Sequence, residues 1–329
     1  MRDRELKLTR RCEDVLTRTR PAGAAALWCG VSPSGALPTD AVWLRYAATG
    51  QTASALPAVP AAPTFGVAVV RLDKAREATQ LALSEAQARL RPDGVTLLYG
   101  ANDEGIRAFD GRDGFVTVDT GAHGRVLSRP ASAFVGEPRS GLAAWRRTRA
   151  SAPLGAPRAW VEYPGCFALG GDDAGSVLLL DSLLAHPAKP GATLDFGCGP
   201  GFLRAGVRAL WPDAPLVAID RDALALEALR ENVPTARALL SDSVEAARPL
   251  APGGYALIVS NPPFHDGHDR THAPWLTLVQ AAPTLLAPGG ELRLVVQRNV
   301  RVEPALKAAF ARVDTVTVTP QYAVWRALR

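Results

Sequence analysis

The sequence has few cysteines, and none of them lie close together. Its 329 residues include only Cys12, Cys29, Cys166 and Cys198, with no C-x-x-C pair. This spacing fits reduced thiols and argues against a structural zinc site. Long apolar runs are also missing, since no stretch approaches the ~20 residues of a membrane helix. No apolar segment follows the Arg-rich residues 1–20, as it would in a secretory signal. We therefore expect a cytoplasmic protein without a membrane partner.

Lysine is scarce, and arginine carries most of the positive charge. The net charge is +5, with four lysines among 37 basic residues. Residues 1–158 carry 22 Lys and Arg against 15 Asp and Glu, whereas residues 159–329 carry 15 against 17. The excess in the first half favours a surface for a polyanion. A compositional preference for arginine explains it equally well, so charge alone leaves both interpretations open.

The second half alternates strand-like and helix-like segments from residue 192 onward. Short apolar runs alternate with segments whose apolar residues recur at helical spacing. The strand-like segments are 192–197, 215–220, 236–242, 255–260, 291–297, 313–319 and 322–328, and the helix-like segments are 201–211, 223–232, 271–286 and 302–310. This order predicts a doubly wound, Rossmann-like α/β domain whose seven-stranded sheet is mostly parallel, with an antiparallel C-terminal hairpin.

A glycine-rich loop follows the first of these strands and opens the next helix. It reads D-x-G-x-G-x-G, from Asp195 through Gly197 and Gly199 to Gly201. Glycine lets the backbone approach a cofactor closely, and the helix N-terminus offers free N–H groups to an anionic end. The spacing differs from the dinucleotide pattern G-x-G-x-x-G, and an acidic residue before the glycines suits a ligand with a positively charged amino acid end. We therefore expect these four residues to bind a cofactor.

Two further carboxylates follow neighbouring strands on the same side of the predicted sheet. Asp220 ends the second strand, where it is placed to accept hydrogen bonds from ribose hydroxyls. Asp242 follows the third strand and is a candidate for the adenine amine of a cofactor. An ordinary turn aspartate explains Asp242 almost as well.

The tetrapeptide Asn261-Pro262-Pro263-Phe264 follows the fourth strand and is the candidate reaction centre. Two prolines hold the backbone extended and remove two N–H donors. The side-chain oxygen of Asn261 and the carbonyl of Pro262 are then two acceptors that can grip both hydrogens of an exocyclic amine, while the Phe264 ring stacks on the base. Alone, the motif is no more than a rigid turn. Beside the glycine loop of a doubly wound sheet, where ligands bind, it predicts catalysis, and Asn261 also borders the cofactor.

Together, the glycine loop and the N-P-P-F motif resemble those of amino-methylating enzymes that use S-adenosylmethionine. The longer string from Ser260 to Gly267 resembles the bacterial small-subunit rRNA guanine-N2 methyltransferase C family, as do Pro164-Gly-Cys-Phe167, Gly175-Ser176 and Leu178–Leu180. The resemblance implies S-adenosylmethionine as cofactor and the N2 amine of one rRNA guanine as acceptor. The sequence departs from the family at Arg298–Glu303, where an aromatic segment is usual, and at Ala323, where a basic residue is common.

His265, His268 and His272 lie near Asp266 and Asp269 at spacings that permit metal ligation. The string His265-Asp266-Gly267 matches the loop of the family, and methyl transfer from a sulfonium needs no metal. We therefore expect no metal site.

The first half repeats part of the pattern of the second half. Residues 65–70 are an apolar strand like 255–260, and a strand at 95–99 follows Leu90-Arg-Pro-Asp-Gly94 as the fifth strand follows Leu286-Ala-Pro-Gly-Gly290. A strand at 24–29 corresponds to the cofactor strand, and 115–120 with 124–128 forms a closing hairpin. The repeat predicts two tandem methyltransferase-like domains. The first copy is degenerate, because Arg71-Leu-Asp-Lys74 replaces N-P-P-F and residues 29–35 lack the D-x-G-x-G-x-G order.

We expect a degenerate domain at 1–136, a basic linker at 137–158 and a catalytic domain at 159–329. The expected partner is rRNA, naked or within the small ribosomal subunit or an assembly intermediate, and the expected state is a monomer. Two alternatives stay open. One is methylation of another acceptor, adenine N6 or a protein glutamine. The other is an RNA-binding assembly factor without catalysis, against which the intact Asp195 loop and Asn261 argue.

Overall fold

The structure is a computed structural model that describes residues 2–48, 51–56, 62–155, 157–262 and 274–329. The chain divides into two compact units. Unit 1 comprises Met1–Tyr46 and Thr52–Arg146, and unit 2 comprises Ala47–Gln51 and Arg147–Arg329. Within the described residues, no helix has both the length and the apolar character needed to cross a membrane.

Unit 2 is a seven-stranded α/β sheet. Its strands are β9 (Thr193–Phe196), β10 (Leu216–Asp220), β11 (Arg237–Leu240), β12 (Tyr255–Ser260), β13 (Leu286–Gln297), β14 (Arg312–Val318) and β15 (Tyr322–Leu328). The order across the sheet is β11-β10-β9-β12-β13-β15-β14, and only the last two pairings are antiparallel. The predicted fold is therefore confirmed, including the C-terminal hairpin, because each predicted strand lies within a few residues of an observed one.

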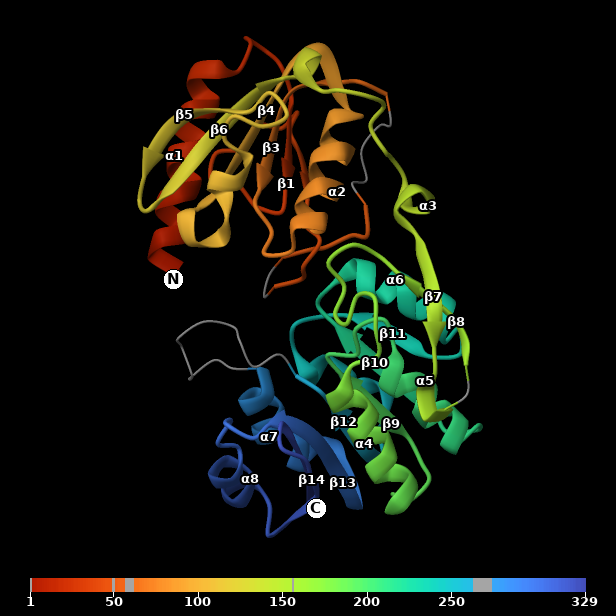
Figure 1. Cartoon of the computed structure of the whole chain (residues 1–329). Coiled ribbons are helices and arrows are strands. Elements are labelled where there is room, and N and C mark those ends of the chain that lie inside the picture. The colour runs from red at the N-terminus through yellow and green to blue at the C-terminus, as the bar shows by residue number, and fades with distance from the viewer. Residues whose placement is uncertain (1, 49–50, 57–61, 156, 263–273) are drawn as a thin grey trace. The chain divides into compact units, whose positions relative to one another are not determined.

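Helices cover both faces of this sheet (Figure 1). The helices of unit 2 are α4 (Ala174–Ala185), α5 (Phe202–Leu210), α6 (Ala223–Asn232), α7 (Pro274–Leu285), α8 (Glu303–Ala309) and the 3₁₀ helices η4 (Pro153–Gly155) and η5 (Val244–Leu250). Helices α4, α5 and α6 bury their apolar side chains against one face, and η5, α7 and α8 against the other. Two separate apolar cores thus hold the carboxyl ends of the parallel strands in place.

Unit 1 has a six-stranded sheet whose order is β2-β1-β3-β4-β6-β5. Its strands are β1 (Ala26–Cys29), β2 (Ala41–Trp43), β3 (Phe65–Arg71), β4 (Leu90–Ala101), β5 (Val116–Gly121) and β6 (Gly124–Pro130). Its helices are α1 (Arg2–Thr19), α2 (Arg76–Gln87), α3 (Leu142–Trp145) and the 3₁₀ helices η1 (Asn102–Glu104), η2 (Ile106–Phe109) and η3 (Ala131–Ala133). Figure 1 shows the sheet between α1 and α2.

The two sheets follow one plan, so the predicted internal duplication is confirmed. The sheet of unit 1 has the order β2-β1-β3-β4-β6-β5. The sheet of unit 2 has, after its edge strand β11, the equivalent order β10-β9-β12-β13-β15-β14. The register shifts coincide as well: β3 shifts against β4 between Phe65 and Val67, and β12 shifts against β13 between Tyr255 and Leu257. Among its described residues, unit 1 has no helices in place of α5 and α6, which follow β9 and β10 in unit 2.

The segment 137–158, which the sequence predicts as a linker, contains regular structure. Residues Arg147–Ser151 form β7, which pairs in antiparallel fashion with β8 (Arg158–Glu162). The division between the units falls inside this segment, after Arg146. Three of the ten residues in these two short strands are arginine, and the strands lack the alternation of apolar and polar residues from which a hairpin is predicted.

Candidate active site

The glycine-rich loop runs from the end of β9 to the start of α5. Gly197, Gly199 and Gly201 all have positive φ, at +73°, +52° and +99°. Positive φ is costly for any residue with a Cβ. At Gly201 a second requirement holds, since a Cβ there would lie 2.4 Å from Cδ1 of Leu229 in α6. The sequence pattern thus reflects both the path of the loop and its close packing.

Asp220, at the end of β10, holds this loop in place. Its Oδ2 accepts a hydrogen bond from the backbone N–H of Gly199 at 2.7 Å, and its Oδ1 accepts one from that of Asp222 at 2.8 Å. Burial raises the pKa of Asp220 to about 6, against the opposing effect of these backbone donors. Asp220 therefore joins the second strand to the cofactor loop of the first.

Asp195 lies in β9 directly beneath the loop and is fully buried. Neither carboxylate oxygen has a hydrogen-bond partner in the described part of the chain. Burial raises its pKa to about 7; the guanidinium of Arg204 opposes this rise, and the charge of Asp220 adds to it. A buried carboxylate without a partner is unfavourable unless it is protonated or a cation approaches it. The site thus offers a place for a positive charge.

Asn261 directly follows β12, whose last residue is anchored to β9 by a hydrogen bond from Ser260 Oγ to the carbonyl of Phe196, 2.7 Å long. The side-chain nitrogen of Asn261 donates to Oδ2 of Asp173 at 2.6 Å and to Oγ of Ser176 at 2.9 Å. Within the described residues, its side-chain oxygen accepts no hydrogen bond. Pro262, the next residue, is buried. The geometry therefore leaves the acceptor predicted from the sequence available.

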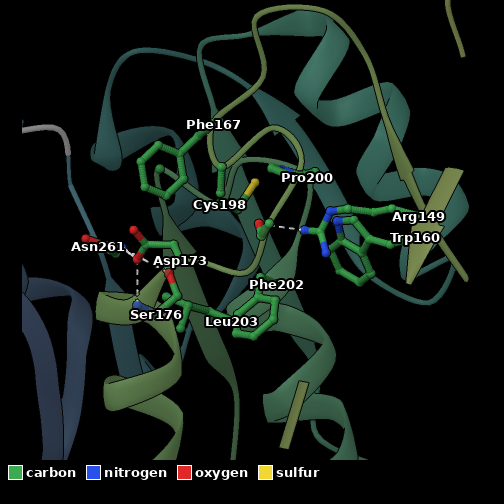
Figure 2. Close-up of a pocket in the computed structure, with 13 residues that line it drawn as sticks. Arg149, Trp160, Phe167, Asp173, Ser176, Cys198, Pro200, Phe202, Leu203 and Asn261 are labelled. Atoms are coloured by element: carbon green, nitrogen blue, oxygen red, sulfur yellow. Dashed lines mark hydrogen bonds between the residues drawn. The ribbon is translucent and has the colours of Figure 1, made fainter. Parts of the chain in front are cut away.

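A pocket lies where these elements meet (Figure 2). Its lining includes Gly197 and Cys198 of the loop, Asn261, Asp173 at the N-cap of α4, and Ser176 of α4. Its other lining residues are Arg149, Trp160, Phe167, Ala168, Gly171, Pro200, Phe202 and Leu203. Phe167 is 54% exposed although it is a large aromatic side chain, so it presents an apolar surface at the pocket.

Arg149 of β7 fixes the loop that leads into α4. Its guanidinium forms an ion pair with Glu162 of β8 and another with Asp172, whose Oδ1 is 2.7 Å away. It also donates to the carbonyl of Gly171 at 2.8 Å. Asp173, the N-cap of α4, directly follows Asp172 in the chain. These contacts of Arg149 therefore help to fix the position at which α4 begins beside Asn261.

The structure brings together most of the residues predicted from the sequence, though not all of them. Gly197 and Asn261 share the pocket, while Asp195, Gly199, Gly201 and Asp220 form its support. Asp242 is exposed and does not line the pocket. Phe264 and the cluster formed by His265, His268 and His272 lie outside the described residues, within which no group of three or more metal-ligating side chains occurs.

Sequence reasoning missed several residues that line the pocket, among them Asp173 and Trp160. Asp173 reads as a plain helix cap, and only the fold places it beside a strand end 88 positions away. Phe167 and Ser176 are visible in the sequence only through the family resemblance.

The chain resembles known proteins over most of its length. Residues 159–326 match the family model described as the methyltransferase small domain. The chain is 32% identical to the ribosomal RNA small subunit methyltransferase C of Stutzerimonas stutzeri, over 82% of this chain and 81% of that protein. Its identity to the protein of the same name from Pseudomonas aeruginosa (strain LESB58) is 34%, over 80% and 79%.

A solved structure is similar to the whole chain. The Thermus thermophilus 16S rRNA N2 G1207 methyltransferase, solved with AdoMet and guanosine, matches with a TM-score of 0.78 and 26% identity, covering 96% of this chain and 91% of that chain. The resemblance that the sequence motifs indicate is therefore confirmed, and the chain is a methyltransferase that belongs to the ribosomal RNA small subunit methyltransferase C family.

Proposed function

We propose that this protein transfers a methyl group from S-adenosylmethionine to the exocyclic N2 amine of a guanine in small-subunit rRNA. The observation that carries the proposal is Asn261, which lines the same pocket as Gly197 and whose side-chain oxygen accepts no hydrogen bond in the described part of the chain. The T. thermophilus protein that is similar over 96% of the chain was solved with AdoMet and guanosine, which supports the same pair of ligands here.

The residues around the loop fit S-adenosylmethionine. A Cβ added at Gly197 would meet no atom within 4 Å, and one at Gly199 would meet only Phe167 Cβ, at 3.8 Å, so the backbone leaves open space at these two positions. The carboxylate of Asp195, which has no hydrogen-bond partner among the described residues, suits the positively charged amino group of the methionine end. Asp220 is placed at the strand end where a ribose hydroxyl is bound in such sheets. Asp242 remains a candidate for the adenine amine. When bound, the cofactor supplies a methyl group that its sulfonium already activates.

One side chain and one main-chain carbonyl of this protein then orient the acceptor. The Asn261 oxygen and the Pro262 carbonyl accept the two hydrogens of the guanine N2 amine and turn its lone pair toward the methyl carbon. The new C–N bond forms as the C–S bond breaks, and the amine then loses one proton to water, because neither acceptor is basic. Orientation of reactants alone supplies roughly 7–11 kcal/mol in favourable cases. Phe264 remains our candidate for stacking on the base.

The RNA partner follows from the same proposal. We infer that the target guanine leaves any helix it occupies, at a cost of a few kcal/mol, and that the basic first half contributes phosphate contacts. We also infer a monomer that acts in the cytoplasm on rRNA, on the small subunit or on an assembly intermediate.

If phosphate contacts dominate, log Kd for rRNA rises linearly with log salt, by roughly 0.7–0.9 per contact. Filter binding between low and physiological salt measures this slope, and an affinity insensitive to salt contradicts an electrostatic role.

The proposed reaction is tested by supplying tritiated S-adenosylmethionine with rRNA from cells that lack the protein. Nucleoside analysis of the product is expected to show N2-methylguanosine. N6-methyladenosine, or label in protein, would support the alternative acceptors. Binding of RNA without any transfer would support a non-catalytic assembly factor, against which Asp195 and Asn261 argue.

A further inference from the structure

We propose that Asp173 is a positioning residue that fixes which end of the Asn261 amide faces the acceptor. This inference rests on the proposed function. Oδ2 of Asp173 accepts from the side-chain nitrogen of Asn261 at 2.6 Å, and Oγ of Ser176 accepts from the same nitrogen at 2.9 Å. Figure 2 shows these side chains converging at one end of the pocket.

The physical reason lies in the symmetry of an amide. Its oxygen and nitrogen ends have nearly the same shape, so packing alone hardly distinguishes the two orientations of Asn261. An ionised carboxylate can only accept hydrogen bonds. With Asp173 in place, the nitrogen of Asn261 must face it, since the reverse orientation would set two oxygens against each other. The oxygen of Asn261 is thereby directed away from α4.

This orientation matters for an amine acceptor. A guanine N2 amine bears two hydrogens, and it needs an acceptor rather than a second donor. With the amide reversed, Asn261 would present its own N–H groups to those of the base. Asp173 thus acts on catalysis through Asn261 and need not touch the base.

Asp173 is itself rigidly held, which lets it serve this purpose. The same Oδ2 accepts from the backbone N–H of Ser176 at 2.7 Å and caps the N-terminus of α4. On the other side of the contact, Ser260 ties the end of β12 to β9. Both partners therefore meet from fixed elements, and the contact spans 88 positions of sequence.

A purely structural role is the competing explanation, because helix and strand end are also linked in unit 1. There Arg71, at the end of β3, pairs with Glu5 of α1. The test must consequently keep the helix cap and change only the contact with Asn261. Asn and Ser cap helices about as well as Asp. Asn retains an acceptor of similar reach without the charge, whereas the side chain of Ser is too short to keep the contact.

The experiment compares Asp173→Asn and Asp173→Ser with the wild-type protein in methyl transfer to rRNA. We expect kcat to fall about twofold to fivefold in Asp173→Asn and about tenfold or more in Asp173→Ser, because a misplaced group near the reacting atoms has large effects. The Kd for S-adenosylmethionine and the melting temperature should stay close to those of the wild type. Asp181→Asn and Asp181→Ser are the matched controls, since Asp181 lies exposed on the same helix.

A second readout does not need activity. In protein labelled with 15N-asparagine, the side-chain amide signals of Asn261 can be assigned by their loss in Asn261→Ala. In both Asp173 variants these signals should shift, and their hydrogens should exchange faster with solvent. Neither change is expected in the Asp181 controls. If either Asp173 variant is unfolded, Ser176→Ala removes the second acceptor while leaving the helix cap, and a fall in kcat of about twofold is expected.

The outcomes separate the two proposals. Wild-type kcat in Asp173→Ser, or an unperturbed Asn261 amide signal in that variant, would overturn the positioning role. If the wild-type protein makes no N2-methylguanosine, the proposed function fails, and the amide signals still decide whether Asp173 orients Asn261.

Discussion

The two units share a strand plan but differ at the ends of equivalent strands. Strand β3 of unit 1 is equivalent to β12 of unit 2, and β1 is equivalent to β9. In these registers Arg71 is equivalent to Asn261, and Trp28 is equivalent to Asp195. The indole N–H of Trp28 donates to Asp40 at 3.4 Å, so this side chain is satisfied within its own unit. The buried carboxylate of Asp195 has no hydrogen-bond partner among the described residues.

The same contrast holds at the second pair of positions. Arg71 is neutralised by Glu5 at 2.6 Å and by Glu104 at 2.8 Å. The side-chain oxygen of Asn261, in contrast, accepts no hydrogen bond from any residue that the structure describes. The comparison teaches that the strand plan is the same in both units, whereas the polar groups at equivalent strand ends differ in whether the described residues satisfy them.

The largest expected effect is a loss of transfer rate on replacing the residue at the end of β12, compared with the residue at the equivalent end of β3. Asn261→Ala should lower the transfer rate by roughly 10²–10³-fold, as the loss of one aligned hydrogen-bonding group does at other reaction centres. The affinity for S-adenosylmethionine should change by no more than a few-fold. Arg71→Ala, its matched control, should leave the rate within about twofold while lowering the unfolding free energy of unit 1 by about 1–3 kcal/mol, because two carboxylates lose their partner. Single-turnover kinetics and thermal unfolding measure the two, and an equal loss of rate in both variants would contradict a site confined to unit 2.

An intermediate effect is expected at the buried carboxylate. Because burial holds the pKa of Asp195 at about 7, the carboxyl is largely protonated below that pH. A bound ammonium group favours the ionised form, so binding releases the proton, and the affinity for S-adenosylmethionine should rise with pH and level off above about 7. Asp220, whose pKa burial raises to about 6, should add to this dependence at the acidic end.

Asp195→Asn should weaken binding by about tenfold at pH 7.5, in line with the loss of a hydrogen bond to a charged group. It should also flatten the pH dependence between pH 6 and 7.5. Calorimetric titration in buffers of different ionisation enthalpy gives both the affinity and the proton release. An unchanged pH profile in the variant would mean that Asp195 does not face the cofactor amine.

The last comparison concerns stability and not the reaction, and it sets Gly201, at the end of the glycine-rich loop, against Gly30, which directly follows β1. Gly201→Ala forces a positive φ on alanine and sets a Cβ 2.4 Å from Leu229, so we expect a loss of roughly 2–4 kcal/mol of stability. Gly30 also has positive φ, +79°, but its nearest neighbour would be Arg71 Cβ at 3.5 Å. Gly30→Ala should therefore cost only about 1–2 kcal/mol. Chemical denaturation measures both, and equal losses would show that the contact with Leu229 relaxes freely.

The sequence predicts the strands of unit 2 well because each is a short apolar run bounded by turn residues. It does not predict α1, although Leu8, Cys12, Val15 and Leu16 are buried along one face of that helix. Their helical spacing is present in the sequence, but the charged residues between them hide it. The apolar side of α1 becomes evident only against the sheet that it covers.

Those parts of the candidate site that lie within a few consecutive residues can be predicted from the sequence. Those parts that the fold brings together from distant positions cannot. The glycine loop and Asn261 can be read from adjacent residues. The contact of Asp173 with Asn261 depends on where α4 packs, and the loss of partners at Asp195 depends on what surrounds it after folding. Neither is encoded in spacing along the chain.

The most direct test of the account is nucleoside mass spectrometry of small-subunit rRNA. The rRNA comes from cells that lack the protein and are supplied with the wild type, Asn261→Ala or Arg71→Ala. Each supplied protein is first confirmed to be folded and equally abundant. The account predicts N2-methylguanosine at the target position with the wild type and with Arg71→Ala, and little with Asn261→Ala, whose transfer rate is expected to be roughly 10²–10³-fold lower. Restoration of the modification by Asn261→Ala would contradict it.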